Sequence, residues 1–270
     1  MLRSKNKPQN TENLEQKTYP NKQALLNQIF CCKLAEFLEV PCLDYNLTKI
    51  KTDKKTVLGT VNKNIKTSPK FQECRSLVPY ASNTVVDIMK HLKERGYSFA
   101  VDEMELSLFK IALFDYLTCQ TSRFDHCFGF LTNGSKIVVA PLYDNEYSFG
   151  LTYDNILNIQ DPSFYSNDKN YMKVLNIPAR FSVYNSARDM IITNAEHWNE
   201  AMELVKYATS KPVVKDYLVS VLNKNYSNFF NNLNLSEIPR EWLEVYKNCI
   251  MSKLKFIKQA TSTKEHEQHY

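Results

Sequence analysis

Apolar residues recur every three or four positions in several segments of the chain, and this spacing is typical of helices. The strongest pattern runs from residue 106 to 117, where apolar side chains cover most of the helix surface, so this helix is predicted to be buried on most sides. Residues 23 to 39 and 85 to 94 show the same period. Three further apolar stripes lie between residues 198 and 254, which predicts that the C-terminal part of the chain is helical.

Shorter segments alternate apolar and polar residues, as half-buried strands do. Residues 43 to 47 alternate in this way, and residues 56 to 61 are predicted to be their antiparallel partner across a charged turn. Asn133-Gly134 stands between two apolar runs and is a strong hairpin signal.

These elements predict an α+β fold in two parts. Residues 1–80 would form a small part with one helix and antiparallel strands, and residues 81–260 a larger, mostly helical part. The charged segment 261–270 is predicted to be a disordered tail. Residues 1 to 22 are polar and without periodicity, which fits either a solvated arm or the remnant of a strand.

Composition narrows the class of protein. Of the 270 residues 43% are hydrophobic and 23% are charged, which suits a globular protein with a core. No apolar run reaches the ~18 residues of a membrane span, and the polar, basic start does not resemble a signal peptide. Seven cysteines without a C-x-x-C pair indicate reduced thiols and a cytoplasmic location. A net charge of +5 permits a nucleic-acid partner but does not call for one, and neither direct binding to nucleic acid nor a membrane partner is expected.

Glycine is scarce, and this excludes one group of nucleotide sites. The chain has five glycines, and no two are spaced as in G-x-G-x-x-G or G-x-x-x-x-G-K. A phosphate loop of either standard type is therefore not expected.

One segment carries a more specific signal. Residues 114 to 150 read FDYLTCQTSRFDHCFGFLTNGSKIVVAPLYDNEYSFG. This segment resembles the catalytic segment of HipA-type serine/threonine kinases and their CtkA-like relatives, roughly F-D-x-L-x-x-N-x-D-R-H-x-x-N-F-G-F, a hairpin, and A-P-L-Y-D. The residues kept are Phe114, Asp115, Leu117, Thr121, Arg123, Phe128, Gly129 and Ala140 to Asp144. Upstream, Lys33 to Pro41 with Tyr45 and the following strand pair resembles the small-lobe helix and strands of the same family.

The resemblance implies a HipA-like, protein-kinase-like fold with a truncated α+β small lobe and a larger helical lobe. It also implies a site for ATP and magnesium, because this family uses a small-lobe lysine, a helix carboxylate, a loop aspartate, a loop asparagine and a second aspartate after the hairpin. Phosphoryl transfer depends on such groups for positioning and charge neutralisation.

Most of these positions are neutral in this chain. The resemblance places the loop aspartate at Ser122, the loop asparagine at Cys127 and the helix carboxylate at Gln28, and only the second aspartate is kept, as Asp144. The lysine is expected near Arg3, in a segment that also contains two lysines. A neutral serine is a poor base and a thiol is a soft ligand, so weak or absent binding of ATP and magnesium is expected.

Other roles stay open for several residues. Asp125 lies three residues from Ser122 and is a candidate for a relocated base. Asp144 would otherwise be a turn residue, and Arg123 is expected to brace neighbouring backbone or acidic groups. Cys31, Cys32 and Cys119 are expected in the core.

The sequence therefore favours a pseudokinase, or a severely weakened serine/threonine kinase, that acts by binding a nucleotide, a protein or both. The expected protein partner is a kinase of the same type or an antitoxin-type protein. Two alternatives stay open: an active HipA-type kinase with an atypical loop, and a structural interaction protein without a nucleotide site.

Overall fold

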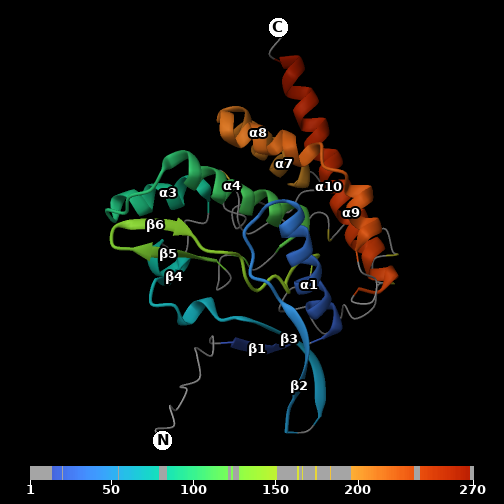
Figure 1. Cartoon of the computed structure of the whole chain (residues 1–270). Helices are drawn as coiled ribbons and strands as arrows, with labels where there is room; N and C mark the ends of the chain where they lie inside the picture. The colour runs from blue at the N-terminus through green and yellow to red at the C-terminus, as the bar shows by residue number, and fades with distance from the viewer. Residues whose placement is uncertain are drawn as a thin grey trace, which may run out of the picture.

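The computed structural model describes most of the chain (Figure 1). The described residues are 14–19, 21–53, 55–78, 84–120, 123, 128–150, 163, 166, 174, 183, 196–233 and 238–267.

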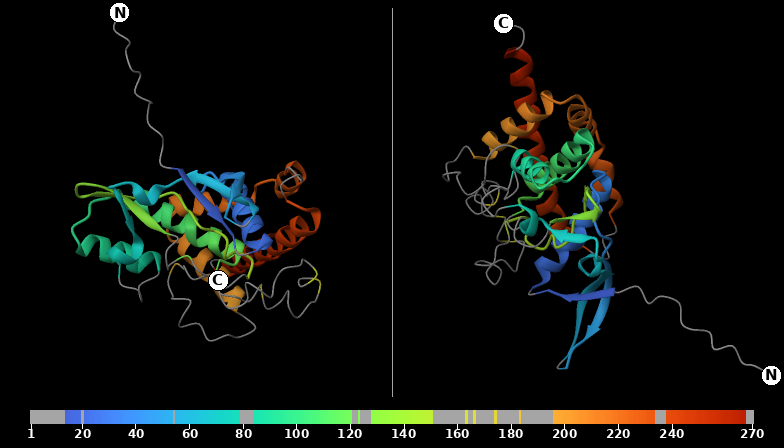
Figure 2. Two further views of the ribbon diagram at one scale, coloured as in Figure 1. Left: turned by 90° about the horizontal axis from the view of Figure 1, so that it is seen from below. Right: turned by 90° about the vertical axis from the view of Figure 1, so that its left-hand side faces the viewer.

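A small antiparallel sheet and one helix form the first part of the fold. Its elements are β1 (Leu14–Thr18), α1 (Lys22–Phe37), β2 (Asn46–Lys51) and β3 (Thr56–Lys63). The strand order is β1-β3-β2, so the first strand of the chain pairs with the last of the three. The β2–β3 hairpin projects from the rest of the molecule (Figures 1 and 2).

A second antiparallel sheet joins distant parts of the chain. Its strands, in the order β4-β5-β6, are β4 (Phe71–Glu73), β5 (Gly129–Asn133) and β6 (Lys136–Val139). Short helices η1 (Ile65–Thr67) and α2 (Cys74–Leu77) flank β4. Gly134 has φ +62°, which confirms the Asn133-Gly134 hairpin. Because β4 pairs with β5, the second sheet draws on both sides of the predicted boundary near residue 80.

Helices make up the remainder. They are α3 (Val85–Glu94), α4 (Val101–Thr118), α7 (Glu196–Thr209), α8 (Pro212–Leu222), α9 (Tyr226–Asn232) and α10 (Arg240–Glu267). Helix α4 is buried nearly all round, as its apolar residues predict, and packs against α3, α8 and α10. Helix α10 continues to Glu267, so residues 261 to 267 are helical, which differs from the predicted disordered tail. The apolar stripe ends at residue 254, but the helix continues, and the hydroxyls of Thr261, Ser262 and Thr263 donate to carbonyls one turn back.

Aromatic packing fixes α1 against the C-terminal helices. The ring of Phe30 is fully buried and stacks on that of Tyr246 with centroids 4.4 Å apart. Phe149 contacts both rings, at 5.6 Å from Phe30 and 4.5 Å from Tyr246. Offset and edge-on ring pairs of this kind add to the free energy of burial. Helix α1 therefore belongs to the main core and is not carried by the small sheet alone.

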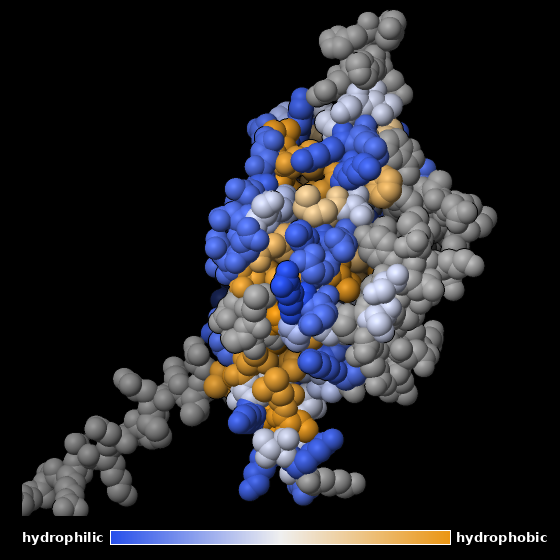
Figure 3. All heavy atoms as spheres, turned by 90° about the vertical axis from the view of Figure 1, so that its right-hand side faces the viewer, coloured by the Kyte–Doolittle hydropathy of each residue, from blue (hydrophilic) through white to orange (hydrophobic). Residues whose placement is uncertain are grey.

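The small sheet is less well covered. The space-filling view shows apolar residues on the β2–β3 hairpin, where Leu58 is 53% exposed (Figure 3). Strand β2 begins at Asn46, later than the predicted alternation from residue 43, because residues 41 to 43 pair with Leu142 instead. Among the helices that the structure describes, none has the combination of length and apolar character that a membrane span requires.

Candidate functional site

The segment that follows β6 lies against α1, the small sheet and the end of α4. Asp144 has φ +54° and Phe149 φ +56°, an uncommon backbone region for residues with a side chain. Three backbone N–H groups hold this path: that of Asp144 donates to the Tyr45 hydroxyl at 3.2 Å, that of Asn145 to Gln28 Oε1 at 2.6 Å, and that of Phe149 to a carbonyl of α4 at 2.6 Å. Surrounding structure thus determines where the Asp144 carboxylate points.

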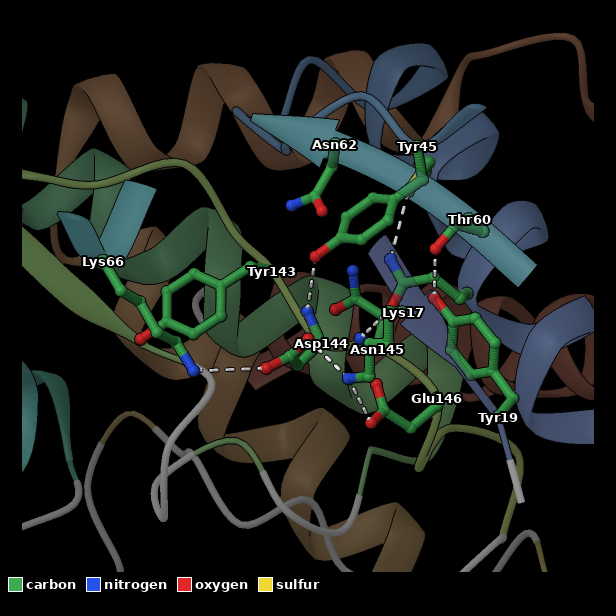
Figure 4. Close-up of polar contacts among 12 residues, drawn as sticks. Lys17, Tyr19, Tyr45, Thr60, Asn62, Lys66, Tyr143, Asp144, Asn145 and Glu146 are labelled. Carbon is green, nitrogen blue, oxygen red and sulfur yellow. Dashed lines mark hydrogen bonds and ion pairs between the residues drawn. The ribbon is translucent and has the colours of Figure 1, made fainter. Parts of the chain in front are cut away.

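Lys17 of β1 binds two carboxylates of this segment (Figure 4). Its Nζ lies 2.7 Å from Asp144 Oδ1 and 2.6 Å from Glu146 Oε1. Burial alone would lower the pKa of Lys17, but the two carboxylates outweigh burial and hold this pKa well above its usual value. Lys66 Nζ lies 3.5 Å from Asp144 Oδ2 and 4.9 Å from the centre of the Tyr143 ring. Two ammonium groups therefore neutralise the Asp144 side chain.

Glu146 is the more buried of the two acids, 6% exposed. Burial raises the pKa of its carboxyl, and Lys17 opposes that shift. Its Oε1 accepts from Lys17, whereas Oε2 is buried and has no hydrogen-bond partner. A buried carboxylate oxygen without a donor is costly, so this atom is suited to receive a cation or a donor.

The small sheet forms the other wall of the site. Lys17 pairs with Thr60, and Asn62 lies two residues further along β3, so the side chains of Lys17, Thr60 and Asn62 lie on one face. The side chain of Asn62 projects from β3 toward Tyr143 and Asp144 (Figure 4). Asn62 is 4% exposed, and its Oδ1 is buried without a hydrogen-bond partner. Unsatisfied oxygens thus lie on both walls of the same site.

Amide side chains tie α1 to the segment. Asn27 Nδ2 donates to the carbonyls of Glu146 at 2.9 Å and Ser148 at 2.7 Å, and its Oδ1 accepts from the Tyr246 hydroxyl at 2.9 Å. Gln28, the position at which the resemblance expects a carboxylate, accepts from the Asn145 backbone. Neutral hydrogen bonds therefore position α1 beside the Asp144 segment.

A buried ion pair holds the segment from the side of α4. Arg123 and Asp115 are both fully buried, and the Arg123 guanidinium donates to both carboxylate oxygens of Asp115 at 2.8 to 3.0 Å. The same guanidinium donates to Asn145 Oδ1 at 2.7 Å and to the carbonyl of Tyr143 at 3.2 Å. The predicted bracing role of Arg123 is confirmed, since its donors fix the residues on either side of Asp144.

Four of the predicted site residues, Arg3, Ser122, Asp125 and Cys127, lie outside the described residues, so their roles stay predictions. Sequence reasoning missed Lys17 and Glu146. Lys17 lies in a strand of five residues, within a segment for which the sequence left both a solvated arm and a strand remnant open, and only the pairing of β1 with β3 brings it to Asp144. Glu146 follows Asp144 by two residues, a spacing that predicts no shared site by itself.

The described residues include no cluster of three or more His, Cys, Asp or Glu side chains that could hold a metal ion. Asp144 and Glu146 nonetheless share one cation, the ammonium of Lys17. Carboxylate and amide oxygens are the donors that magnesium prefers, and magnesium is commonly held by one or two carboxylates together with substrate phosphates. Asp144, Glu146 and Asn62 carry oxygens of the type that magnesium prefers, and Lys17 is bound to both carboxylates.

No family model matches the chain, and no curated protein is similar to it in sequence. Among solved structures, the chain is similar to the Helicobacter pylori proinflammatory kinase CtkA, with 13% identity and a TM-score of 0.64 over 94% of this chain and 90% of that one. A second match is the Shewanella oneidensis complex of HipA, HipB and operator DNA, with 9% identity and a TM-score of 0.45 over 92% of this chain and 60% of that one. The match to CtkA shows that the chain has a CtkA-like kinase fold, as its sequence predicts.

The Arg123–Asp115 pair gives a prediction for stability. Replacing Arg123 by Met should cost about 3–5 kcal/mol of unfolding free energy at neutral pH, because the carboxylate of Asp115 is left buried without its partner. Burial already raises the pKa of Asp115 to about 6. A carboxyl whose pKa is higher in the folded state loses stability as pH rises through that range, and without Arg123 the range extends upward. Urea unfolding should therefore show a larger loss for Arg123→Met at pH 8 than at pH 5.

The matched control is the double variant Arg123→Met with Asp115→Asn, which removes the uncompensated charge and should recover much of the loss. An equal loss at both pH values, or no recovery in the double variant, would contradict the assigned role of this pair.

Proposed function

We propose that the chain is a kinase-fold protein that binds ATP with magnesium between β1–β3 and the Asp144 segment, and that it transfers phosphate weakly or not at all. The observation that carries this proposal is the pair of contacts from Lys17 to Asp144 and Glu146 beneath the sheet. A lysine beside a metal-binding aspartate is the arrangement that neutralises nucleotide phosphates in kinases.

Each described residue has a role in this proposal. Lys17 is the cation for the phosphates, since its ammonium stays charged throughout the ordinary pH range. Asp144 and Glu146 hold magnesium, with Glu146 supplying a ligand that the resemblance does not predict. Magnesium, when bound, neutralises charge on the phosphates. Asn62 offers an acceptor to the nucleotide or to a water molecule on the metal.

The chemical step is expected to be slow. Ser122 and Cys127 stand where the resemblance expects a base and a metal ligand. General acid–base catalysis contributes about two to four orders of magnitude in rate, so the loss of one base alone is enough to make transfer inefficient. The function then depends on binding, and the partner we propose is a protein, either a kinase of this type or an antitoxin-type protein.

Nucleotide binding can be measured as stabilisation. ATP and magnesium at ~100 times the dissociation constant should raise the unfolding free energy by ~2.7 kcal/mol, measured as a shift of the thermal midpoint. Lys17→Met and Asp144→Asn should each abolish most of the shift, because the first removes the cation that faces the phosphates and the second removes a carboxylate that holds magnesium. Lys49→Met, which changes an exposed lysine of β2, is the matched control and should keep it. No shift in the wild-type protein at millimolar ATP would favour the structural interaction protein.

Metal binding should depend on pH through Glu146. Burial raises the pKa of this carboxyl above its usual value, so manganese, used as a paramagnetic substitute for magnesium, should begin to dissociate at a higher pH than an ordinary glutamate would allow. Electron paramagnetic resonance of free manganese between pH 5 and 8 measures this loss. Glu146→Gln should bind manganese at least tenfold more weakly at pH 7.5, and its binding should no longer fall with pH through the titration of residue 146. The control Glu94→Gln should behave as wild type. Unchanged binding in Glu146→Gln would remove Glu146 from the ligand set.

Phosphate transfer separates a weakened kinase from an active one. Incubation with labelled ATP, magnesium and manganese should give no autophosphorylation above that of Asp144→Asn. A clear signal that disappears in both Asp144→Asn and Asp125→Ala would instead establish the active kinase with a relocated base.

A further inference from the structure

Two cysteines from different elements lie together at the edge of a cavity. Cys32 of α1 and Cys42, which follows the helix, have their Sγ atoms 3.7 Å apart. Both are half-buried and line a cavity of about 460 Å³ between α1 and residues 40 to 47. Cys31 and Cys119 are fully buried, as the sequence predicts. Cys32 was expected in the core as well, but it is only half-buried. A small reagent in the cavity can therefore reach this pair.

The two thiols belong to a closed ring of hydrogen bonds. Cys42 Sγ donates to Cys32 Sγ, which also accepts from Gln28 Nε2 at 3.3 Å. Gln28 Oε1 accepts from the backbone N–H of Asn145, and Asn145 Nδ2 donates to Cys42 Sγ at 3.6 Å. Each of the four residues thus contacts the next, and Asn145 directly follows Asp144 in the chain.

The backbone around the ring is also paired. Residues 41 and 43 exchange hydrogen bonds with Leu142 at 2.8 Å each, which fixes Cys42 beside the strand end that leads to Asp144. Forming a disulfide would bring the sulfur atoms from 3.7 Å to the ~2.0 Å of an S–S bond. Their hydrogen bond would be lost, and both sulfur atoms would become weaker acceptors for Gln28 and Asn145.

We propose that Cys32 and Cys42 form a dithiol site that is oxidised by small organic disulfides, and that this oxidation loosens the Asn145 backbone beside Asp144. The inference goes beyond the proposed function and does not depend on nucleotide or metal binding.

The chemistry starts at Cys42. The hydrogen bond from Cys42 and burial together hold the pKa of Cys32 well above its usual value, so Cys32 stays a thiol at neutral pH. Cys42, after losing its proton to water, attacks one sulfur of the reagent, forms a mixed disulfide and releases one thiolate. Cys32 then gives up its proton and attacks Cys42 Sγ, which releases the second thiolate. Two protein thiols are oxidised to one disulfide, and the reagent is reduced to two thiols.

Peptide mass spectrometry tests the site. The full chain is incubated with oxidised glutathione, alkylated, digested and mapped. A Cys32–Cys42 cross-link should form, while Cys74 and Cys249, which are fully buried, should be alkylated only after unfolding. Cys32→Ser should stop at a stable glutathione adduct on Cys42. Cys42→Ser should leave Cys32 unmodified. Cys74→Ser is the matched control and should cross-link as wild type. A cross-link to another cysteine, or no cross-link, would overturn the proposal.

Amide hydrogen exchange tests the coupling to Asn145. The Asn145 N–H is buried and hydrogen-bonded to Gln28, so it should exchange slowly in the reduced protein. Oxidation should speed its exchange at least tenfold, with little change at core amides of α4. Unchanged exchange at Asn145 in a fully cross-linked sample would contradict the proposed coupling between oxidation of the two thiols and the Asn145 backbone. Both experiments are done without ATP and metal, so their outcomes do not depend on nucleotide binding.

Discussion

The buried guanidinium of Arg123 is the interaction on which the site depends. It is fully buried, pairs with Asp115 of α4 and donates to groups on both sides of Asp144. A buried cation of this kind is tolerated only where a carboxylate and further acceptors surround it. Because those acceptors come from α4 and from the segment after β6, satisfying Arg123 sets the position of that segment against the helix. The contacts of Arg123 with Tyr143 and Asn145 thereby help to hold Asp144 in its left-handed backbone conformation.

Charged side chains lie on one side of that segment, and neutral polar groups lie on the other. Toward the small sheet, Asp144 and Glu146 meet Lys17 and Lys66. Toward α1, the contacts are amides and thiols. Helix α1 contacts the backbone of the segment through the neutral side chains of Asn27 and Gln28. Lys17 obtains its counter-charge from the segment itself, which makes the position of the lysine independent of any acid on α1.

Asn145 connects the two sides of the segment. Asn145 accepts from Arg123, donates its backbone N–H to Gln28 and contacts Cys42, so one residue joins the buried ion pair to the thiol ring. A change at the thiols is therefore transmitted through a short, continuous set of hydrogen bonds to the neighbour of Asp144. The aromatic packing of Phe30, Phe149 and Tyr246 resists larger movements of α1, so the expected response is local.

The sequence alone determined those features that depend on local patterns. The period of apolar residues predicted α1, α4 and the C-terminal helices, Asn133-Gly134 predicted the hairpin, and the run from residue 114 to 150 led to the kinase-like fold and to Asp144. Tertiary structure alone decided which charges meet Asp144. Lys17 reaches it because β1 pairs with β3, across more than forty residues of chain. The proximity of Cys32 and Cys42 likewise depends on the pairing of residues 41 and 43 with Leu142. Such contacts leave no periodic trace in the chain, because they are set by the packing of segments distant in sequence.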